Sequence, residues 1–179
     1  MAWRSQGLRG SPFEETIDLT NRLYAQQGLA LVQKVPTSIT PIEVDNAQHT
    51  ITLAYFEKKS TVDFIGVAQG LAICFDAKET RQSRLPLRNI HAHQIAFMQA
   101  FAQQRGVSFL LVRFCSTNEI FLLPIETLAR AAQQAEAGGR KSIPYDDFDP
   151  ALRVPTKDFP VHYLVAINAY LAQRERSNI

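Results

Sequence analysis

The stretch TVDFIGVAQGLAICFDAKE, residues 61–79, decides the fold of this chain. It holds two apolar, β-branched runs separated by Gln69-Gly70, which is the pattern of a β-hairpin with a tight turn. With a loop of two or four residues centred on this turn, Ala68 lies opposite Leu71. The register of both strands follows from that pair.

Counting outward from the turn places Asp63 directly opposite Asp76. Two carboxylates with Cβ atoms roughly 5 Å apart destabilise a strand pair unless a positive charge compensates them. Mg²⁺ supplies that charge, because it takes oxygen ligands at about 2.1 Å and accepts waters and phosphate oxygens beside a few carboxylates. Strand alternation puts Lys78 on the same face as Asp76 at about 7 Å, where its ammonium can stabilise a phosphoryl group. These three side chains predict a site that hydrolyses phosphodiesters.

A second interpretation fits the same residues. Asp63 would be a turn residue, and Asp76 and Lys78 would form the solvated face of an edge strand. The rest of the chain decides between the two interpretations.

On the N-terminal side, the sequence predicts a helix that begins after Ser11 and ends at Gly28. A strand follows over residues 29–35. Two weaker strands, 39–44 and 49–56, flank a turn-like segment, and their low hydrophobicity predicts an exposed hairpin.

On the C-terminal side, apolar spacing, prolines and glycines mark the remaining elements. They are a polar, basic loop over 80–88, a helix over 91–105, buried strands over 107–114 and 119–123, a helix from Pro124 to Gly138, an irregular stretch over 140–159 and a last helix opened by Pro160. This order predicts an α/β fold with a mixed sheet flanked by helices.

Composition limits the classes of protein. The chain has 179 residues, of which 46% are hydrophobic and 20% charged, so one compact domain is expected. It contains no run of 18 apolar residues and no signal-like apolar segment near Met1, so we expect a cytoplasmic protein without a membrane span. Cys74 and Cys115 lie in apolar runs and are predicted to be buried strand residues rather than zinc ligands. A net charge of +2 permits nucleic acid without requiring it.

Blocks spread over most of the chain resemble the RecU-type Holliday junction resolvases of the PD-(D/E)XK nuclease superfamily. These blocks are RGSPFEETIDLTNRLY (9–24), KVPTSITPI (34–42), YFEKKSTVDFIGV (55–67), FDAKET (75–80), LPLRNIHAHQ (85–94) and GRKSI (139–143). The resemblance implies a single nuclease domain over 1–179 with a restriction-endonuclease-like core and an inserted stalk hairpin over 37–57.

The resemblance also implies roles for the central residues. Asp63 matches the first metal-binding aspartate of the family and Lys78 its catalytic lysine. Asp76 matches the second acidic ligand, where many relatives have glutamate. The implied cofactor is Mg²⁺, with Mn²⁺ able to substitute.

Three outer positions match the family as well. Thr61 and Gln94 match metal-associated positions, and Glu14 matches a glutamate that supports the site. Without the resemblance, Thr61 would be a loop hydroxyl, Gln94 a surface helix residue and Glu14 a partner of its own helix N-terminus. His91 and His93 lie close to Gln94 and are interpreted as hydrogen-bonding or DNA-contacting residues outside the catalytic set.

Positive charges bracket the acidic pair in the sequence and predict contacts to DNA phosphates, with a solvated charged surface as the alternative. They are Lys58, Lys59, Arg81, Arg84, Arg88, Arg140 and Lys141. The implied substrate is a four-way DNA junction, cut by a homodimer because the junction has two equivalent strands. Recombinase and branch-migration proteins are further implied partners. The alternatives are a different nuclease on this fold and a non-catalytic module that binds branched DNA or modulates a recombinase.

Overall fold

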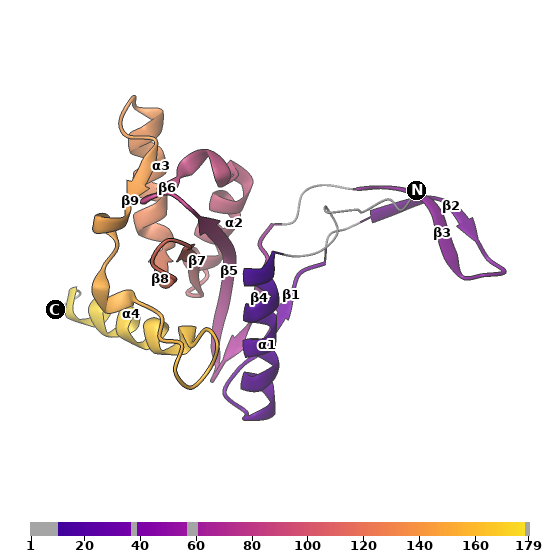
Figure 1. Ribbon diagram of the computed structural model, residues 1–179, viewed down its shortest axis with the longest axis horizontal. Helices are drawn as coiled ribbons and strands as arrows, with labels where there is room; N and C mark the ends of the chain where they lie inside the picture. Colours follow the sequence, from indigo (N-terminus) through magenta and orange to yellow (C-terminus); the bar gives the residue numbers. More distant parts are fainter. Residues whose placement is uncertain (1–10, 37–38, 57–60, 178–179) are drawn as a thin grey trace.

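The computed structural model describes residues 11–36, 39–56 and 61–177. A mixed five-stranded sheet with the order β1-β4-β5-β7-β8 forms the centre of the body (Figure 1). Its strands are β1 (Leu31–Lys34), β4 (Phe64–Ala68), β5 (Leu71–Thr80), β7 (Val107–Phe114) and β8 (Glu119–Pro124). Only the β5–β7 pair is parallel, and the other neighbours are antiparallel.

Helices cover both faces of this sheet, so the predicted class of a mixed sheet flanked by helices is confirmed. On one face, α1 (Pro12–Gln26) and α4 (Tyr163–Ser177) pack on apolar side chains such as Phe75 and Phe109. On the other face, α2 (Ala92–Gln103) and α3 (Ile125–Glu136) pack on Cys74, Leu110 and Val112. Each face of the sheet thus buries its own hydrophobic core.

The hairpin of β4 and β5 has the predicted register. Its turn is the two-residue Gln69-Gly70, and both residues have positive φ, at 49° and 86°, which suits the right-handed twist of the strands. Ala68 pairs with Leu71, and Phe64 pairs with Phe75 at the far end. Gly66 lets β1 approach closely, since a Cβ there would overlap the backbone of Leu31.

A second hairpin consists of β2 (Ile39–Asp45) and β3 (Thr50–Phe56), which pair with each other in a sheet of their own. Figure 1 shows it extended away from the body. The side chains of residues 41–44 and 50–55 are exposed as predicted, and they include the large apolar residues Ile42, Val44, Ile51, Leu53 and Tyr55. The tip is closed by Asp45, whose Oδ1 accepts the backbone N–H groups of Ala47 and Gln48.

Four sequence predictions were wrong in detail. The segment 80–88 is not a simple loop, because β6 (Arg84–Pro86) pairs with β9 (Ser142–Pro144) and is followed by the 3-10 helix η1 (Leu87–Asn89). The stretch 140–159 likewise holds β9 and two 3-10 helices, η2 (Tyr145–Asp147) and η3 (Pro150–Leu152).

The other two errors concern single positions. The last helix begins at Tyr163, not at Pro160, because Val161 bonds by its backbone N–H to Thr20 of α1 before the helix starts. Cys115 is exposed, because β7 ends at Phe114 and Cys115 opens the turn to β8, whereas Cys74 is buried as predicted. No helix among the described residues is long and apolar enough to cross a membrane.

Candidate active site

The structure places Asp63 at the end of the β4–β5 hairpin opposite Asp76. Asp63 directly precedes β4. Because Phe64 pairs with Phe75, the residue of β5 that lies opposite Asp63 is Asp76. Its backbone carbonyl accepts the N–H of Val35 at 2.8 Å, which ties it to the edge strand. Its carboxylate Oδ2 accepts the backbone N–H of Ala77 at 2.9 Å. Asp63 is therefore held by both neighbouring strands.

Asp76 lies on β5, in the middle of the sheet, and its side chain is fully buried. Its Oδ1 accepts the side-chain amide of Gln94 at 2.9 Å. Its Oδ2 is in ion-pair contact with the Lys78 ammonium. The interpretation of Asp76 as a solvated edge residue is therefore excluded.

The two carboxylates affect each other's protonation. Burial raises the pKa of Asp63 to about 7, and the charge of Asp76 and contact with its carboxyl add to the rise. The N–H of Ala77 and the ammonium of Lys78 lower the pKa of Asp63, but by less than these effects raise it. A carboxyl with so high a pKa lacks sufficient positive charge beside it, which is the condition that a bound cation would relieve.

The residues of this site suit a hard cation. The carboxylates of Asp63 and Asp76 supply the oxygen ligands that Mg²⁺ prefers. Among the residues that the structure describes, no group of three or more His, Cys, Asp or Glu side chains gathers for a metal. Waters and phosphate oxygens would complete the coordination of Mg²⁺ here, as is usual for this ion.

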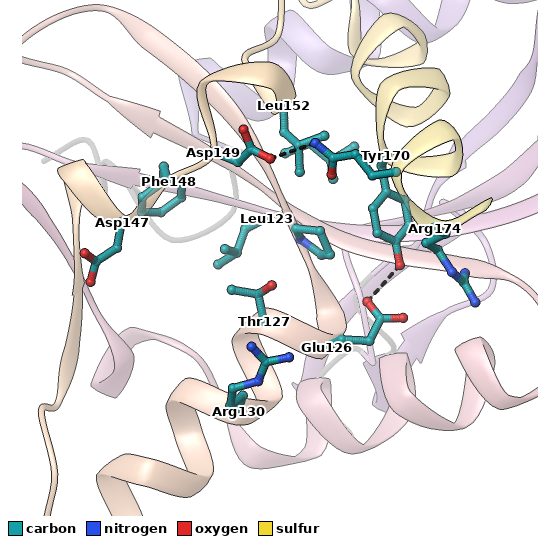
Figure 2. Close-up of a pocket in the computed structure, with 13 residues that line it drawn as sticks. Leu123, Glu126, Thr127, Arg130, Asp147, Phe148, Asp149, Leu152, Tyr170 and Arg174 are labelled. Carbon is teal, nitrogen blue, oxygen red and sulfur yellow. Dashed lines mark hydrogen bonds between the residues drawn. The ribbon is translucent and has the colours of Figure 1, made fainter. Parts of the chain in front are cut away.

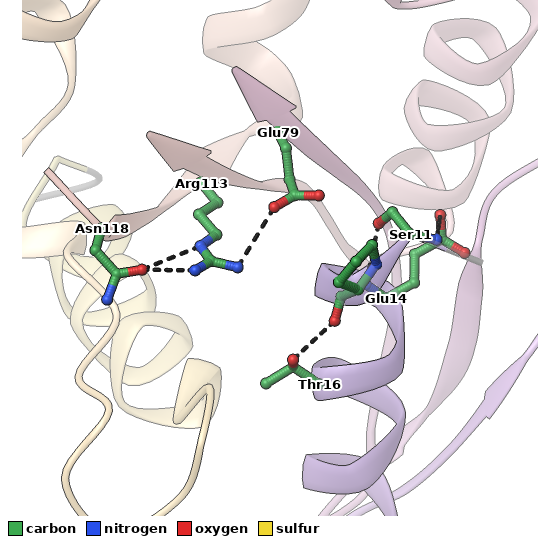
Figure 3. A network of polar contacts seen from close by, with 7 residues as sticks. Ser11, Glu14, Thr16, Glu79, Arg113 and Asn118 are labelled. Carbon is green, nitrogen blue, oxygen red and sulfur yellow. Dashed lines mark hydrogen bonds and ion pairs between the residues drawn. The ribbon is translucent and has the colours of Figure 1, made fainter. Parts of the chain in front are cut away.

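Of the outer positions, Thr61 is exposed in a bend before Asp63, whereas Gln94 is buried and contacts Asp76. Glu14 lies in the first turn of α1, where its Oε1 accepts the N–H of Ser11 (Figure 3). Its Oε2 forms an ion pair of 2.7 Å with Lys34 at the end of β1. Lys34 was not predicted, because no local pattern in β1 distinguishes a lysine that pairs with a distant helix.

A second polar network lies at the same end of the sheet, on the α1 side. Arg113 of β7 bonds to Glu79 of β5 at 3.4 Å and to Asn118 of the β7–β8 turn at 2.7 Å (Figure 3). Its guanidinium also lies over the ring of Phe13 at 6.0 Å from the centroid. This network joins α1 to β7 and to β5, the strand that carries Asp76.

Pairing of β6 with β9 brings two basic segments together. We define the β6–β9 basic cluster as the exposed residues Arg81, Arg84, Arg88, Arg140 and Lys141. Arg84 pairs with Pro144, and the N–H of Leu87 donates to the carbonyl of Lys141 at 3.1 Å. Arg81, Arg84 and Arg88 lie between β5, which carries Asp76, and α2, which carries Gln94, whereas Arg140 and Lys141 lie between α3 and β9. Lys58 and Lys59 lie outside the described residues.

A cavity of about 510 Å³ lies elsewhere, between β8, α3 and α4 (Figure 2). Its acidic residues already have partners: Glu126 accepts the hydroxyl of Tyr170 at 2.8 Å, and Asp149 accepts the side-chain amide of Gln173 at 2.7 Å. Neither Asp63 nor Asp76 lines it. The acidic pair, rather than this cavity, is therefore the candidate active site.

Comparison with known proteins places the chain in a family. A sequence model of the family described as "RecU: Recombination protein U" matches residues 8–169. The chain belongs to the RecU family. Relatives of this RecU chain include a Lactococcus lactis protein named "Holliday junction resolvase RecU", 40% identical over 168 residues that cover 90% of this chain and 78% of the relative.

Two further RecU relatives with the same name are similar to the chain. One, from Streptococcus pneumoniae, is 44% identical over 140 residues, covering 76% of this chain and 70% of the relative. Another, from Oceanobacillus iheyensis, is 38% identical over 168 residues, covering 92% of this chain and 83% of the relative. Among solved structures, Archaeoglobus fulgidus Hjc, titled "a Holliday junction resolvase from an archaeal hyperthermophile", aligns at 10% identity and a TM-score of 0.37, covering 63% of this chain and 74% of that chain.

Proposed function

We propose that this RecU-family chain is a Holliday junction resolvase, a metal-dependent endonuclease that nicks four-way DNA junctions symmetrically during recombination and repair. The observation that carries the proposal is the opposed pair of Asp63 and Asp76 with Lys78 beside it. A protein that only binds DNA has no need of two carboxylates in one buried site, since burying like charges together costs stability. The relatives' names support the choice of substrate.

In this proposal Asp63 and Asp76 bind Mg²⁺ or Mn²⁺, assisted by Thr61. When bound, the cation supplies positive charge to the scissile phosphate and lowers the pKa of a coordinated water. Lys78 lies against Asp76, with its side chain 20% exposed, so its ammonium can reach a phosphate at the surface while remaining fixed by the ion pair. Glu14, held by Lys34, supports this end of the sheet.

The β6–β9 basic cluster is proposed to hold the DNA backbone, together with Lys58 and Lys59. Its five cations are exposed. Arg81, Arg84 and Arg88 lie between β5 and α2, and the pairing of β6 with β9 brings Arg140 and Lys141 to the same segment. Contacts of this kind neutralise phosphates without reading sequence. The β2–β3 hairpin, as a stalk inserted in a single nuclease domain, is proposed to give preference for the junction centre.

Symmetric cutting requires two active sites related by a two-fold axis, so we propose that the chain acts as a homodimer. Recombinase and branch-migration proteins are the proposed protein partners, and the cytoplasm is the proposed location.

The proposal is tested with a mobile four-way junction and a linear duplex of matched sequence, each with Mg²⁺ or with excess chelator. We expect paired nicks at symmetric positions in the junction, little cutting of the duplex and no cutting in chelator. Equal cutting of both substrates would point to a different nuclease. Tight junction binding without any cutting would favour a non-catalytic module.

A further inference from the structure

We propose that the groove between α3 and β9 is a further phosphate-binding site, which holds the DNA backbone where it passes beyond the β6–β9 basic cluster. This role rests on the proposed nuclease function, which supplies the identity of the ligand. The α3–β9 groove encloses about 270 Å³. The polar side chains that line it are Thr127, Arg130, Gln134, Arg140, Ser142 and Asp147.

One face of α3 supplies half of this groove. Thr127, Arg130 and Gln134 follow each other at intervals of three and four residues, so their side chains form a row along the helix. Figure 2 shows Thr127 and Arg130 projecting from α3 beside the segment that carries Asp147. Ile143 of β9 is buried in the same hydrophobic core as the inner face of α3. The row is therefore held beside β9 by packing.

Most polar groups of the α3–β9 groove are hydrogen-bond donors that other parts of the protein leave available. Within residues 11–36, 39–56 and 61–177, no group forms a hydrogen bond or ion pair with the side chains of Thr127, Arg130, Gln134 or Ser142. Arginine, serine, threonine and glutamine are among the side chains that contact the phosphates and sugars of DNA. The guanidinium of Arg130 is exposed and can donate to two oxygens of one phosphate.

The groove is continuous with the β6–β9 basic cluster. Arg140 belongs to both, and Ser142 of β9 pairs with Pro86 of β6. A DNA backbone that crosses β6 and β9 from the active site thus meets Arg140 and then Arg130. Because phosphates repeat regularly along each strand, one phosphate can contact the cluster while another lies in the groove.

One carboxylate in the groove opposes the binding of an anion. Asp147 forms an ion pair of 3.5 Å with Arg140, and both side chains are exposed. Exposed ion pairs contribute little to stability, so a phosphate can replace Asp147 as the partner of Arg140. Removing the charge of Asp147 should therefore strengthen DNA binding, whereas removing Arg130 should weaken it.

Two substitutions with opposite expected effects test the site. They are Arg130→Ala, which keeps α3 because alanine is the best helix former, and Asp147→Asn. Arg176→Ala removes an exposed arginine of α4 and is the matched control. Binding of a four-way junction and of a linear duplex is measured in chelator at several salt concentrations, and thermal unfolding checks that each variant folds.

Arg130→Ala should lower the slope of log affinity against log salt by about 1 on both DNAs, because phosphate contacts do not read sequence. Its loss of affinity relative to the wild type should be about three- to fourfold greater at about 50 mM than at about 200 mM salt. Asp147→Asn should bind about two- to fivefold more tightly. With Mg²⁺, Arg130→Ala should raise KM on the junction and leave kcat unchanged.

An unaltered slope in Arg130→Ala would overturn the proposed site, and so would an equal change in Arg176→Ala. If Arg130→Ala does not fold, Asp147→Asn decides alone, since unchanged or weaker DNA binding contradicts a phosphate in the groove. The binding measurements do not require cleavage. A wild-type protein that binds DNA but cuts no junction would therefore remove the proposed nuclease function while leaving the phosphate site fully tested.

Discussion

The carboxylate of Asp63 accepts a hydrogen bond of 2.9 Å from the backbone N–H of Ala77, the residue between Asp76 and Lys78 on the neighbouring strand. This bond brings the acid of one strand to the face that carries the other acid and the lysine. Burial and the charge of Asp76 nevertheless raise the pKa of Asp63 to about 7. The free protein therefore carries an electrostatic cost at this candidate site above neutral pH.

That cost predicts how stability depends on pH. The unfolded chain has an aspartate pKa near about 4, so the folded protein retains the proton of Asp63 over a range in which the unfolded chain has lost it. The stability contributed by this group is full below about pH 4 and decreases as pH rises to about 7, the folded pKa.

Asp63→Asn should remove this dependence. At pH 8 in chelator we expect the variant to be more stable than the wild type by up to about 4 kcal/mol, from a pKa difference of about three units, or roughly 8–16 °C in Tm. At pH 4 the difference should be small. Thermal unfolding at both pH values checks this, and a variant less stable than the wild type at pH 8 would contradict the assigned cause.

Salt dependence tests the β6–β9 basic cluster. The double substitution Arg84→Ala with Lys141→Ala removes two exposed cations from paired segments. Each lost phosphate contact should lower the slope of log affinity against log salt by about 1. Lys157→Ala, an exposed cation outside the cluster, should leave the slope unchanged. Junction binding by the double variant with an unaltered slope would remove the cluster from the DNA interface.

Shortening the β2–β3 hairpin tests its role as a stalk. Asp45 pairs with Thr50, so residues 46–49 can be replaced by Asn-Gly while both strands keep their register. We expect junction affinity to fall about tenfold, equivalent to about 1.4 kcal/mol, with less change in duplex affinity. Competition binding with both DNAs measures this, and an unaltered preference would exclude the hairpin from junction recognition.

Local patterns were sufficient to predict the centre of this fold. Gln69-Gly70 marks a two-residue turn, and strand periodicity of two then fixes Asp63 opposite Asp76 without further information. The first residues of α1 and α3 were predicted from Ser11 and Pro124, and the ends of the helices from the glycines that follow each apolar pattern.

Other features depend on contacts between distant segments and carry no local pattern. The pairing of Arg84 with Pro144 joins residues 60 positions apart through a three-residue strand. The ion pair of Lys34 could not be predicted because its partner, Glu14, lies on α1. The hydrogen bond from Gln94 to Asp76 likewise depends on how α2 packs against β5. Cys115 is exposed whereas Cys74 is buried, because β7 ends at Phe114, one residue before Cys115.

The most direct test of the account compares wild type, Asp63→Asn and Asp76→Asn for Mg²⁺-dependent cleavage and for binding of one four-way junction. Both substitutions remove a charged oxygen ligand with little change in side-chain size, so the rate should fall by about 100- to 1,000-fold. Junction affinity in chelator should stay close to that of the wild type. Cleavage retained by either variant would contradict an active site built on these two aspartates.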